Sequence, residues 1–213
     1  TAEFYASRDV SDIQSPGLIK PFKTISAALN SAREGFPDWI LLSKSDVWEV
    51  DEKIQLKRGR AKSERFVFNS YGDGKERPLI KSSASEAIRI WSNRNYTAVV
   101  GISFYAYKRD PESSEFMGWG NVPESTGLRI YSPEGTVMGT LLLEDNMFSF
   151  FSTGVSITGG GNLVDAVVRR NIIQNSYSEK NHSQGMYAGK SSILLEENIF
   201  YHNGWYKQQI GSG

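Results

Sequence analysis

The sequence predicts an all-β protein with the fold of a parallel β-helix, a solenoid of strands. Three stretches repeat one phrase, in which an apolar run is followed by two charged residues, Asn and two apolar residues. They read L-L-L-E-D-N-M-F, A-V-V-R-R-N-I-I and I-L-L-E-E-N-I-F, at 141–148, 166–173 and 193–200. Their asparagines lie 25 and 27 residues apart. Strand-like phrases that recur at such a period are typical of solenoids.

A second phrase repeats out of phase with the first. It reads S-E-A-I-R-I-W-S, S-T-G-L-R-I-Y-S, S-T-G-V-S-I-T-G and S-Q-G-M-Y-A-G, at 85–92, 125–132, 152–159 and 183–189. Alternate residues of a strand point to opposite faces, so half of each phrase should be buried. The expected inward residues are Ile88, Ile90, Leu128, Ile130, Val155, Ile157, Met186 and Ala188. A β-sandwich is the main rival fold, but it gives no reason for an in-register repeat.

A short amphipathic helix is predicted at about residues 20–33. Pro21 suits its first turn, and one face is apolar. The residues of that face are Phe22, Ile25, Ala28, Leu29 and Ala32. A helix here would cap the open apolar end of the solenoid.

Strands follow the helix wherever apolar, β-branched and aromatic residues gather. They are expected at 39–42, 53–56, 65–69, 78–81, 87–91, 98–104, 127–131, 140–143, 154–158, 166–168, 185–188 and 193–195.

One turn of the repeat carries an insertion, the irregular segment at about 107–124. The second phrase recurs after 40 residues at this point, whereas the next interval is 27 residues. Long insertions on a repetitive scaffold are often functional. Phe116, Met117 and Trp119 suit a lip over a ligand, with Trp119 as a substrate-binding residue. The alternative is that the insertion only covers an apolar wall.

The chain, 1–213, is expected to form one β-helix domain. No capping segment follows the last phrase, which ends at Phe200. An uncapped turn exposes strand edges. We therefore expect the natural chain to continue past Gly213, and the open end to be capable of self-association.

Composition narrows the class of function. The 24 basic and 24 acidic residues balance, which argues against nucleic acid as a partner. No apolar run reaches the roughly 18 residues of a membrane span. The chain has no cysteines, which excludes disulfides and thiolate metal sites. Aromatic residues make up 12% of the chain and either pack in the core or stack on sugars.

The chain resembles the pectate-lyase-like superfamily of right-handed parallel β-helix proteins, and its first stretches resemble their N-terminal cap and first turn. The matching stretches are F-K-T-I-S-A-A-L-N-S-A at 22–32 with P-D-W-I-L-L-S-K-S-D-V-W at 37–48, F-N-S-Y-G-D-G-K-E-R-P-L-I at 68–80 and H-S-Q-G-M-Y at 182–187. The resemblance covers nearly the whole chain and implies the fold, right-handed and single-stranded. The resemblance does not specify a function, because the superfamily includes lyases, hydrolases, epimerases and tailspikes.

In that superfamily the substrate usually lies along the outside of one parallel sheet. Here the second phrase supplies that sheet, and its outward positions stack as Arg89, Arg129, Ser156 and Tyr187, then as Trp91, Tyr131 and Thr158. Arginine can bind a carboxylate through two parallel hydrogen bonds, and aromatic rings stack on sugars. Arg89, Trp91 and Tyr131 are therefore candidate substrate-binding residues for an acidic polysaccharide. The alternative is a solvated face whose arginines stack on aromatic rings.

A β-elimination lyase needs a cation at the uronate carboxylate, a base for the C5 proton and an acid for the leaving oxygen. Arg129 or Lys180 could supply the cation, His182 or Lys180 the base, and Tyr187 the acid. Histidine titrates near neutral pH, which suits a base. The alternative for His182 is a turn residue bonded to the backbone. His202 also lies in a turn and is expected to be structural.

Other chemistries of the superfamily lack their residues. Paired aspartates of polygalacturonase-type hydrolases are replaced by Ser125-Thr126, Ser152-Thr153 and Ser183-Gln184, so no carboxylate pair is expected. The Asp-Pro-His of mannuronan epimerases is also absent, because Asp110-Pro111 precedes Glu112.

The repeated Asn and the charged pair that precedes it are expected to be structural. The asparagines should stack as an amide ladder. Acidic pairs at 144–145 and 196–197 could bind Ca²⁺, but the pair between them is Arg169-Arg170, which favours cross-strand ion pairs. No cofactor and no metal site are assigned.

The sequence thus predicts a secreted or periplasmic carbohydrate-active β-helix that binds or cleaves a uronate-containing polysaccharide by β-elimination. The alternative is a non-catalytic glycan-binding or adhesive module.

Overall fold

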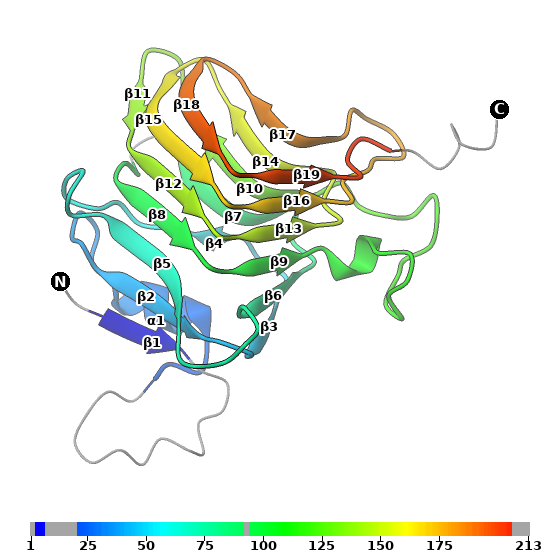
Figure 1. Ribbon diagram of the computed structural model, residues 1–213, viewed down its shortest axis with the longest axis horizontal. Helices are drawn as coiled ribbons and strands as arrows, with labels where there is room; N and C mark the ends of the chain where they lie inside the picture. Colours follow the sequence, from blue (N-terminus) through cyan, green and yellow to red (C-terminus); the bar gives the residue numbers. More distant parts are fainter. Residues whose placement is uncertain (1–2, 7–20, 92–93, 206–213) are drawn as a thin grey trace.

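The structure is a computed structural model, and it describes residues 3–6, 21–91 and 94–205. Within these residues the chain winds into a parallel β-helix whose strands stack in three sheets of eight, six and five strands (Figure 1). Every pairing between the strands is parallel. The predicted fold is confirmed.

The strands of the eight-stranded sheet are β1 (Glu3–Ala6), β2 (Trp39–Ser43), β5 (Phe66–Tyr71), β8 (Thr97–Val100), β11 (Val137–Gly139), β12 (Leu141–Glu144), β15 (Asn162–Arg169) and β18 (Ser191–Glu196). Those of the six-stranded sheet are β3 (Val47–Val50), β6 (Leu79–Ser82), β9 (Ser103–Tyr105), β13 (Met147–Ser149), β16 (Ile172–Gln174) and β19 (Ile199–Tyr201). Those of the five-stranded sheet are β4 (Ile54–Gln55), β7 (Glu86–Trp91), β10 (Thr126–Tyr131), β14 (Thr153–Thr158) and β17 (Gln184–Ala188).

The core runs along the axis of the coil and is filled by alternate residues of the strands. In the five-stranded sheet, Ile88 pairs with Leu128 and Leu128 with Val155, and all three are fully buried. Met186 and Ala188 lie in register with the buried Val155 and Ile157, and Met186 packs against the core, but Met186 is only half-buried and Ala188 is exposed. Both lie on β17, the outermost strand of this sheet among the described residues.

The helix α1 is shorter than predicted and covers Ile25–Ser31. Thr24 caps it by accepting a hydrogen bond from the amide of Ala27 at 3.2 Å, as N-cap threonines do. Pro21 therefore lies before the helix rather than in its first turn. Ile25, Ala28 and Leu29 are buried and join the core at the N-terminal end of the coil.

The six-stranded sheet was mostly missed by the sequence prediction. Its strands β13, β16 and β19 have only three residues each, directly after the repeated Asn. The single strand predicted at 98–104 is in fact two strands, β8 and β9, separated by a turn at Gly101 with φ of 68°. These strands could not be recognised in the sequence, because three residues are too few to show an alternation of apolar and polar residues.

The amide ladder is confirmed. Asn146 Nδ2 donates to Asn171 Oδ1 at 3.0 Å, and Asn171 Nδ2 donates to Asn198 Oδ1 at 3.0 Å. Each of these oxygens also accepts the backbone amide of the preceding Asn, at 3.0 Å. Asn146 and Asn171 are buried, so the ladder holds the turns in register.

The charged pairs beside the ladder form cross-strand ion pairs, as expected. Arg169 and Arg170 reach Glu144 at 2.8 and 3.2 Å, and Arg170 also reaches Glu197 at 2.8 Å. Of the carboxylates considered for Ca²⁺, Glu144 and Glu197 are thus held by these arginines, and Asp145 pairs with Arg77 at 2.5 Å. In the described part of the chain, no group of three His, Cys, Asp or Glu residues is arranged to hold a metal ion.

The last turn exposes apolar side chains. On β18 and β19 the large exposed ones are Leu194, Leu195, Ile199, Phe200 and Tyr201. Self-association through this end stays a prediction. No helix among the described residues is long and apolar enough to cross a bilayer.

Candidate functional site

The outer face of the five-stranded sheet carries the arginines and aromatic residues that the sequence predicted there. Arg89 on β7 lies in register with Arg129 on β10, and Trp91 lies in register with Tyr131. The rings of Trp91 and Tyr131 stack, with centroids 4.5 Å apart and planes inclined by 25°. Trp91 remains 37% exposed, so the pair offers apolar area to a ligand.

Glu86, which the sequence analysis overlooked, lies between the two arginines. Its carboxylate is buried, pairs with Arg89 Nε, and lies 3.1 Å from Arg129 Nε. The hydrogen bond that Arg89 donates to Glu86 raises the pKa of Arg89. A signal existed in the sequence, because Glu86 occupies the place in the repeat that Thr126 and Thr153 take in later turns.

A pocket of about 260 Å³ opens where these strands begin. It brings together Arg129 from β10 and His182 from the turn before β17, two of the four residues predicted to be catalytic. His182 is exposed, and the exposed fraction of the Arg129 side chain is 38%. The remaining lining residues are Ser85, Glu86, Glu124, Ser125, Thr126, Ser152, Thr153 and Asn181. We call this cavity the Arg129 pocket.

Two carboxylates, Glu86 and Glu124, line the Arg129 pocket. The expectation that no carboxylate pair is in place for hydrolysis stays a prediction. It considered paired aspartates next to each other in sequence, whereas these glutamates come from different turns. Glu86 is engaged by both arginines, while Glu124 Oε1 accepts a hydrogen bond from the Ser178 hydroxyl at 2.7 Å.

Lys180 lies in a neighbouring pocket of about 490 Å³. Asn181 and His182 line both pockets, so the two cavities meet at this turn. Glu179 and Trp205 belong to the second pocket alone. Lys180 is exposed and is separated from Arg129 by this shared wall.

Tyr187 lies on the same outer face, two strands from Arg129. The register runs from Arg129 to Ser156 and from Ser156 to Tyr187. Two strand spacings place the Cα atoms of Arg129 and Tyr187 roughly 10 Å apart. Tyr187 is 47% exposed, and it does not line the Arg129 pocket.

Trp119 packs against Phe116 of the insertion and against two aromatic residues of later turns. Its ring lies 5.6 Å from Tyr177 and 5.9 Å from Trp205, by centroids. Because Trp205 lines the second pocket, Trp119 stands behind that pocket's wall. His202 stacks on Trp205 at 5.2 Å and accepts or donates a hydrogen bond with Asn175 at 2.9 Å.

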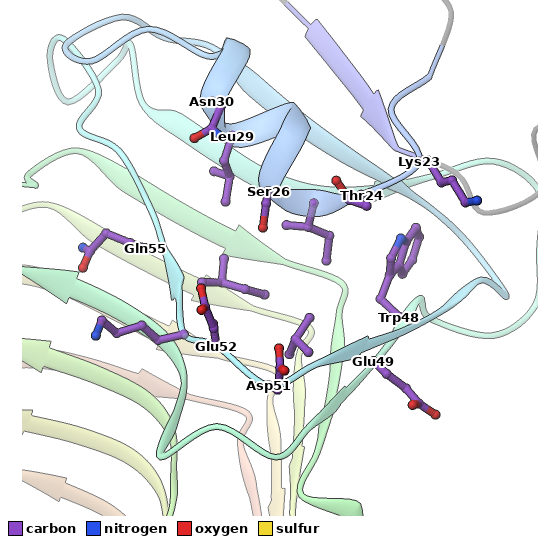
Figure 2. A pocket seen from close by; sticks show the side chains of 14 residues that line it. Lys23, Thr24, Ser26, Leu29, Asn30, Trp48, Glu49, Asp51, Glu52 and Gln55 are labelled. Carbon is purple, nitrogen blue, oxygen red and sulfur yellow. The ribbon is translucent and has the colours of Figure 1, made fainter.

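A further cavity of about 420 Å³ lies at the N-terminal end of the coil. Figure 2 shows side chains of the α1 segment and of residues 48–55 on opposite sides of it. It shares no lining residue with the Arg129 pocket and contains none of the residues predicted to be functional. Apart from Trp119, the site residues predicted from sequence thus gather on the five-stranded sheet and the turn before β17.

The chain matches no protein-family model and no curated protein. Solved structures that are similar to it include a lyase and an esterase. A rhamnogalacturonan lyase is 13% identical, with a TM-score of 0.47, over 95% of this chain and 52% of that one. A pectin methylesterase in complex with a hexasaccharide is 16% identical, with a TM-score of 0.44, over 95% of this chain and 66% of that one.

The chain therefore spans about half the length of the rhamnogalacturonan lyase that it matches. The three stacked parallel sheets confirm the expected parallel β-helix as a fold.

Proposed function

We propose that the protein binds an acidic, uronate-containing polysaccharide along the outer face of the five-stranded sheet and cleaves it by β-elimination in the Arg129 pocket. The observation that carries the proposal is that Arg129 and His182 line one pocket at the edge of this face. The stacked Trp91–Tyr131 pair lies further along the same strands and would hold neighbouring sugars.

Arg129 is suited to hold the uronate carboxylate. Its Nε faces Glu86, and its Nη2 lies 3.4 Å from Thr126 Oγ1, which fixes the guanidinium at the pocket wall. A cation beside the carboxylate stabilises the charge that builds up when the C5 proton leaves. Arg129 shares Glu86 with Arg89, so these three side chains together carry one net positive charge, beside Glu124 as the second carboxylate of the pocket.

The elimination then needs one base and one acid. His182 would take the C5 proton, and the electron pair of the C5–H bond would form the C4–C5 double bond as the C4–O bond breaks. The leaving oxygen would take a proton from Tyr187 or, through the adjoining pocket, from Lys180. Tyr187 would serve only if the chain of sugars runs across the strands, because it lies two strands from Arg129.

A second candidate function is glycan binding without cleavage. The observation that favours it is the capture of both arginines by Glu86, a buried carboxylate. Guanidinium groups already paired with a protein carboxylate offer less to a substrate carboxylate in the transition state. A face of this kind would still hold an acidic chain through the remaining positive charge and the aromatic pair.

The two functions are separated by the ultraviolet absorbance of unsaturated uronate during incubation with alginate, pectate and glycosaminoglycans, with and without Ca²⁺. Cleavage should be lost in Arg129→Met and His182→Gln. Arg60→Met and His202→Gln are the matched controls, because both lie outside the Arg129 pocket.

Binding of the same polymers is followed in parallel by calorimetry. Binding without a rise in absorbance would support the non-catalytic module. The proposal would be wrong if the protein neither bound nor cleaved any polymer, and the site assignment would be wrong if both site variants kept full activity.

A further inference from the structure

Arg109 is a fully buried cation at the base of the insertion. It lies in the 3₁₀ helix η1 (Tyr107–Arg109), is 1% exposed, and its guanidinium donates to the carbonyls of Pro123, Phe150 and Tyr177. It also lies over the Tyr177 ring, 4.5 Å from the centroid. Burial lowers the pKa of Arg109. Burying a charge costs free energy unless the charge is hydrogen-bonded. The hydrogen bonds of Arg109 therefore fix the positions of these three carbonyl groups.

The carbonyls that Arg109 binds lie next to the site. Pro123 directly precedes Glu124, and Tyr177 directly precedes Ser178. The Ser178 hydroxyl donates to Glu124 Oε1 at 2.7 Å. Arg109 therefore fixes the backbone on both sides of the Glu124–Ser178 hydrogen bond, although it does not line the pocket.

Ser178 also shapes the turn that carries His182. Its hydroxyl oxygen accepts the amides of Lys180 and Asn181 at 3.2 and 2.8 Å. Asn181 and His182 then form the wall shared by the two pockets. One buried cation thus sets the positions of two opposite sides of the Arg129 pocket, namely Glu124 from the insertion and His182 from the turn before β17.

Glu124 gives the pocket a second kind of contact. It is half-buried, and Ser178 is the one hydrogen-bond donor to its carboxylate among the described residues. A carboxylate accepts hydrogen bonds from sugar hydroxyl groups but repels anionic groups, whether carboxylate, sulfate or phosphate. Arg129 can pair with one anionic group of a sugar, so an additional sulfate would be repelled by Glu124 without compensation. With Arg129 in the same pocket, the site suits a sugar that presents one carboxylate and free hydroxyl groups.

We propose that Arg109 is a positioning residue for Glu124 and His182, and that Glu124 determines specificity by accepting a sugar hydroxyl and rejecting sulfated sugars. The insertion at 107–124 would then be part of the site rather than only a cover. The specificity of Glu124 rests on the proposed function, whereas the positioning role of Arg109 does not.

The specificity is tested with Glu124→Gln, which removes the charge and keeps the shape. The control is Glu115→Gln, because Glu115 also lies in the insertion and accepts one hydrogen bond, from Lys81 at 2.8 Å. Binding of pectate and of a sulfated glycosaminoglycan is measured for both variants. Glu124→Gln should shrink the preference for pectate about tenfold, since hydrogen bonds to charged groups and charge repulsion are of that order. Glu115→Gln should leave it unchanged.

The positioning is tested without any ligand. The ring signals of His182 in nuclear magnetic resonance spectra, assigned with His182→Gln and His202→Gln, should shift in Arg109→Lys and in Ser178→Ala. The amides of Lys180 and Asn181 should exchange at least tenfold faster in both variants, because one hydrogen bond is lost or misplaced. Arg109→Lys keeps the cation, so it avoids the loss of folding that an apolar replacement risks.

The outcomes separate the two proposals. If the His182 signals and the two amides are unchanged in Arg109→Lys and Ser178→Ala, the positioning role is wrong whatever the protein binds. If they change but wild type binds no polymer, the proposed function fails and the specificity of Glu124 fails with it. If wild type binds pectate and Glu124→Gln keeps the full preference over the sulfated polymer, the specificity is wrong while the proposed function stands.

Discussion

Replacing Asn171 by Ala tests the amide ladder at its centre. The Asn171 side chain accepts the amide of Asn146 and Asn146 Nδ2, and it donates to Asn198 Oδ1 and to the carbonyls of Leu143 and Arg169, all between 2.9 and 3.0 Å. Asn146 is fully buried, so its amide would lose its partner where water does not reach. An orphaned buried donor costs about 1–3 kcal/mol, and each lost bond adds roughly 0.5–1.5 kcal/mol. With about 1 kcal/mol for the orphaned Asn146 amide and about 0.5 kcal/mol for each of the other four bonds, we expect a loss of about 3 kcal/mol in the free energy of unfolding.

The control is Asn198→Ala at the outer end of the ladder. Asn198 is half-buried, and water can replace its bonds in part, so the expected loss is about 1 kcal/mol. Asn171→Asp should cost at least as much as Asn171→Ala, because its carboxylate would face two carbonyl oxygens. The assay is urea unfolding followed by tryptophan fluorescence, with the m-value checked for constancy. A loss in Asn171→Ala no larger than in Asn198→Ala would refute the reasoning.

Three further changes probe the site and its support. Glu86→Gln should tighten binding of acidic polymers while lowering the free energy of unfolding by about 1–2 kcal/mol, because it releases Arg89 and Arg129 from a buried carboxylate. Weaker binding in calorimetry would contradict this prediction. Glu115→Gln is the control for the change in net charge. Burial raises the pKa of Tyr177 to about 12 from 10.0, so the stability due to its neutral hydroxyl is complete below pH 10 and is lost as the pH rises through about 12. The free energy of unfolding of the wild type should therefore fall more steeply with pH across that window than that of Tyr177→Phe. Equal slopes would refute the assignment. Gly127→Ala would place a methyl group 2.5 Å from the Gly154 carbonyl oxygen and 2.7 Å from Phe148, so we expect a loss of about 1–3 kcal/mol by denaturant unfolding, whereas Gly139→Ala, with Val164 at 3.8 Å, should be tolerated.

The site combines residues that are far apart in the chain because each turn of the coil adds one strand to each face. Glu86, Arg129 and His182 come from three different turns, yet they line one pocket. This arrangement lets single substitutions in separate turns alter one ligand contact without disturbing the register, which the ladder and the core maintain.

The repeats of the sequence determined the coil, the register of the five-stranded sheet and the amide ladder. Those features depend on strict spacing, and spacing is visible along the chain. The alignment of Arg89 with Arg129 and of Trp91 with Tyr131 could be predicted because the strands pair in parallel with equal phrases opposite each other. The three-residue strands could not be predicted, since they are too short to show a period.

The tertiary structure alone decided how the candidate site is divided. It placed Arg129 and His182 in one pocket, put Lys180 in the next, and set Trp119 behind the wall of the second. It also revealed Glu86 between two arginines and Arg109 beneath the insertion. These contacts join turns through irregular segments, whose paths follow side-chain packing and buried hydrogen bonds rather than any repeat in the sequence.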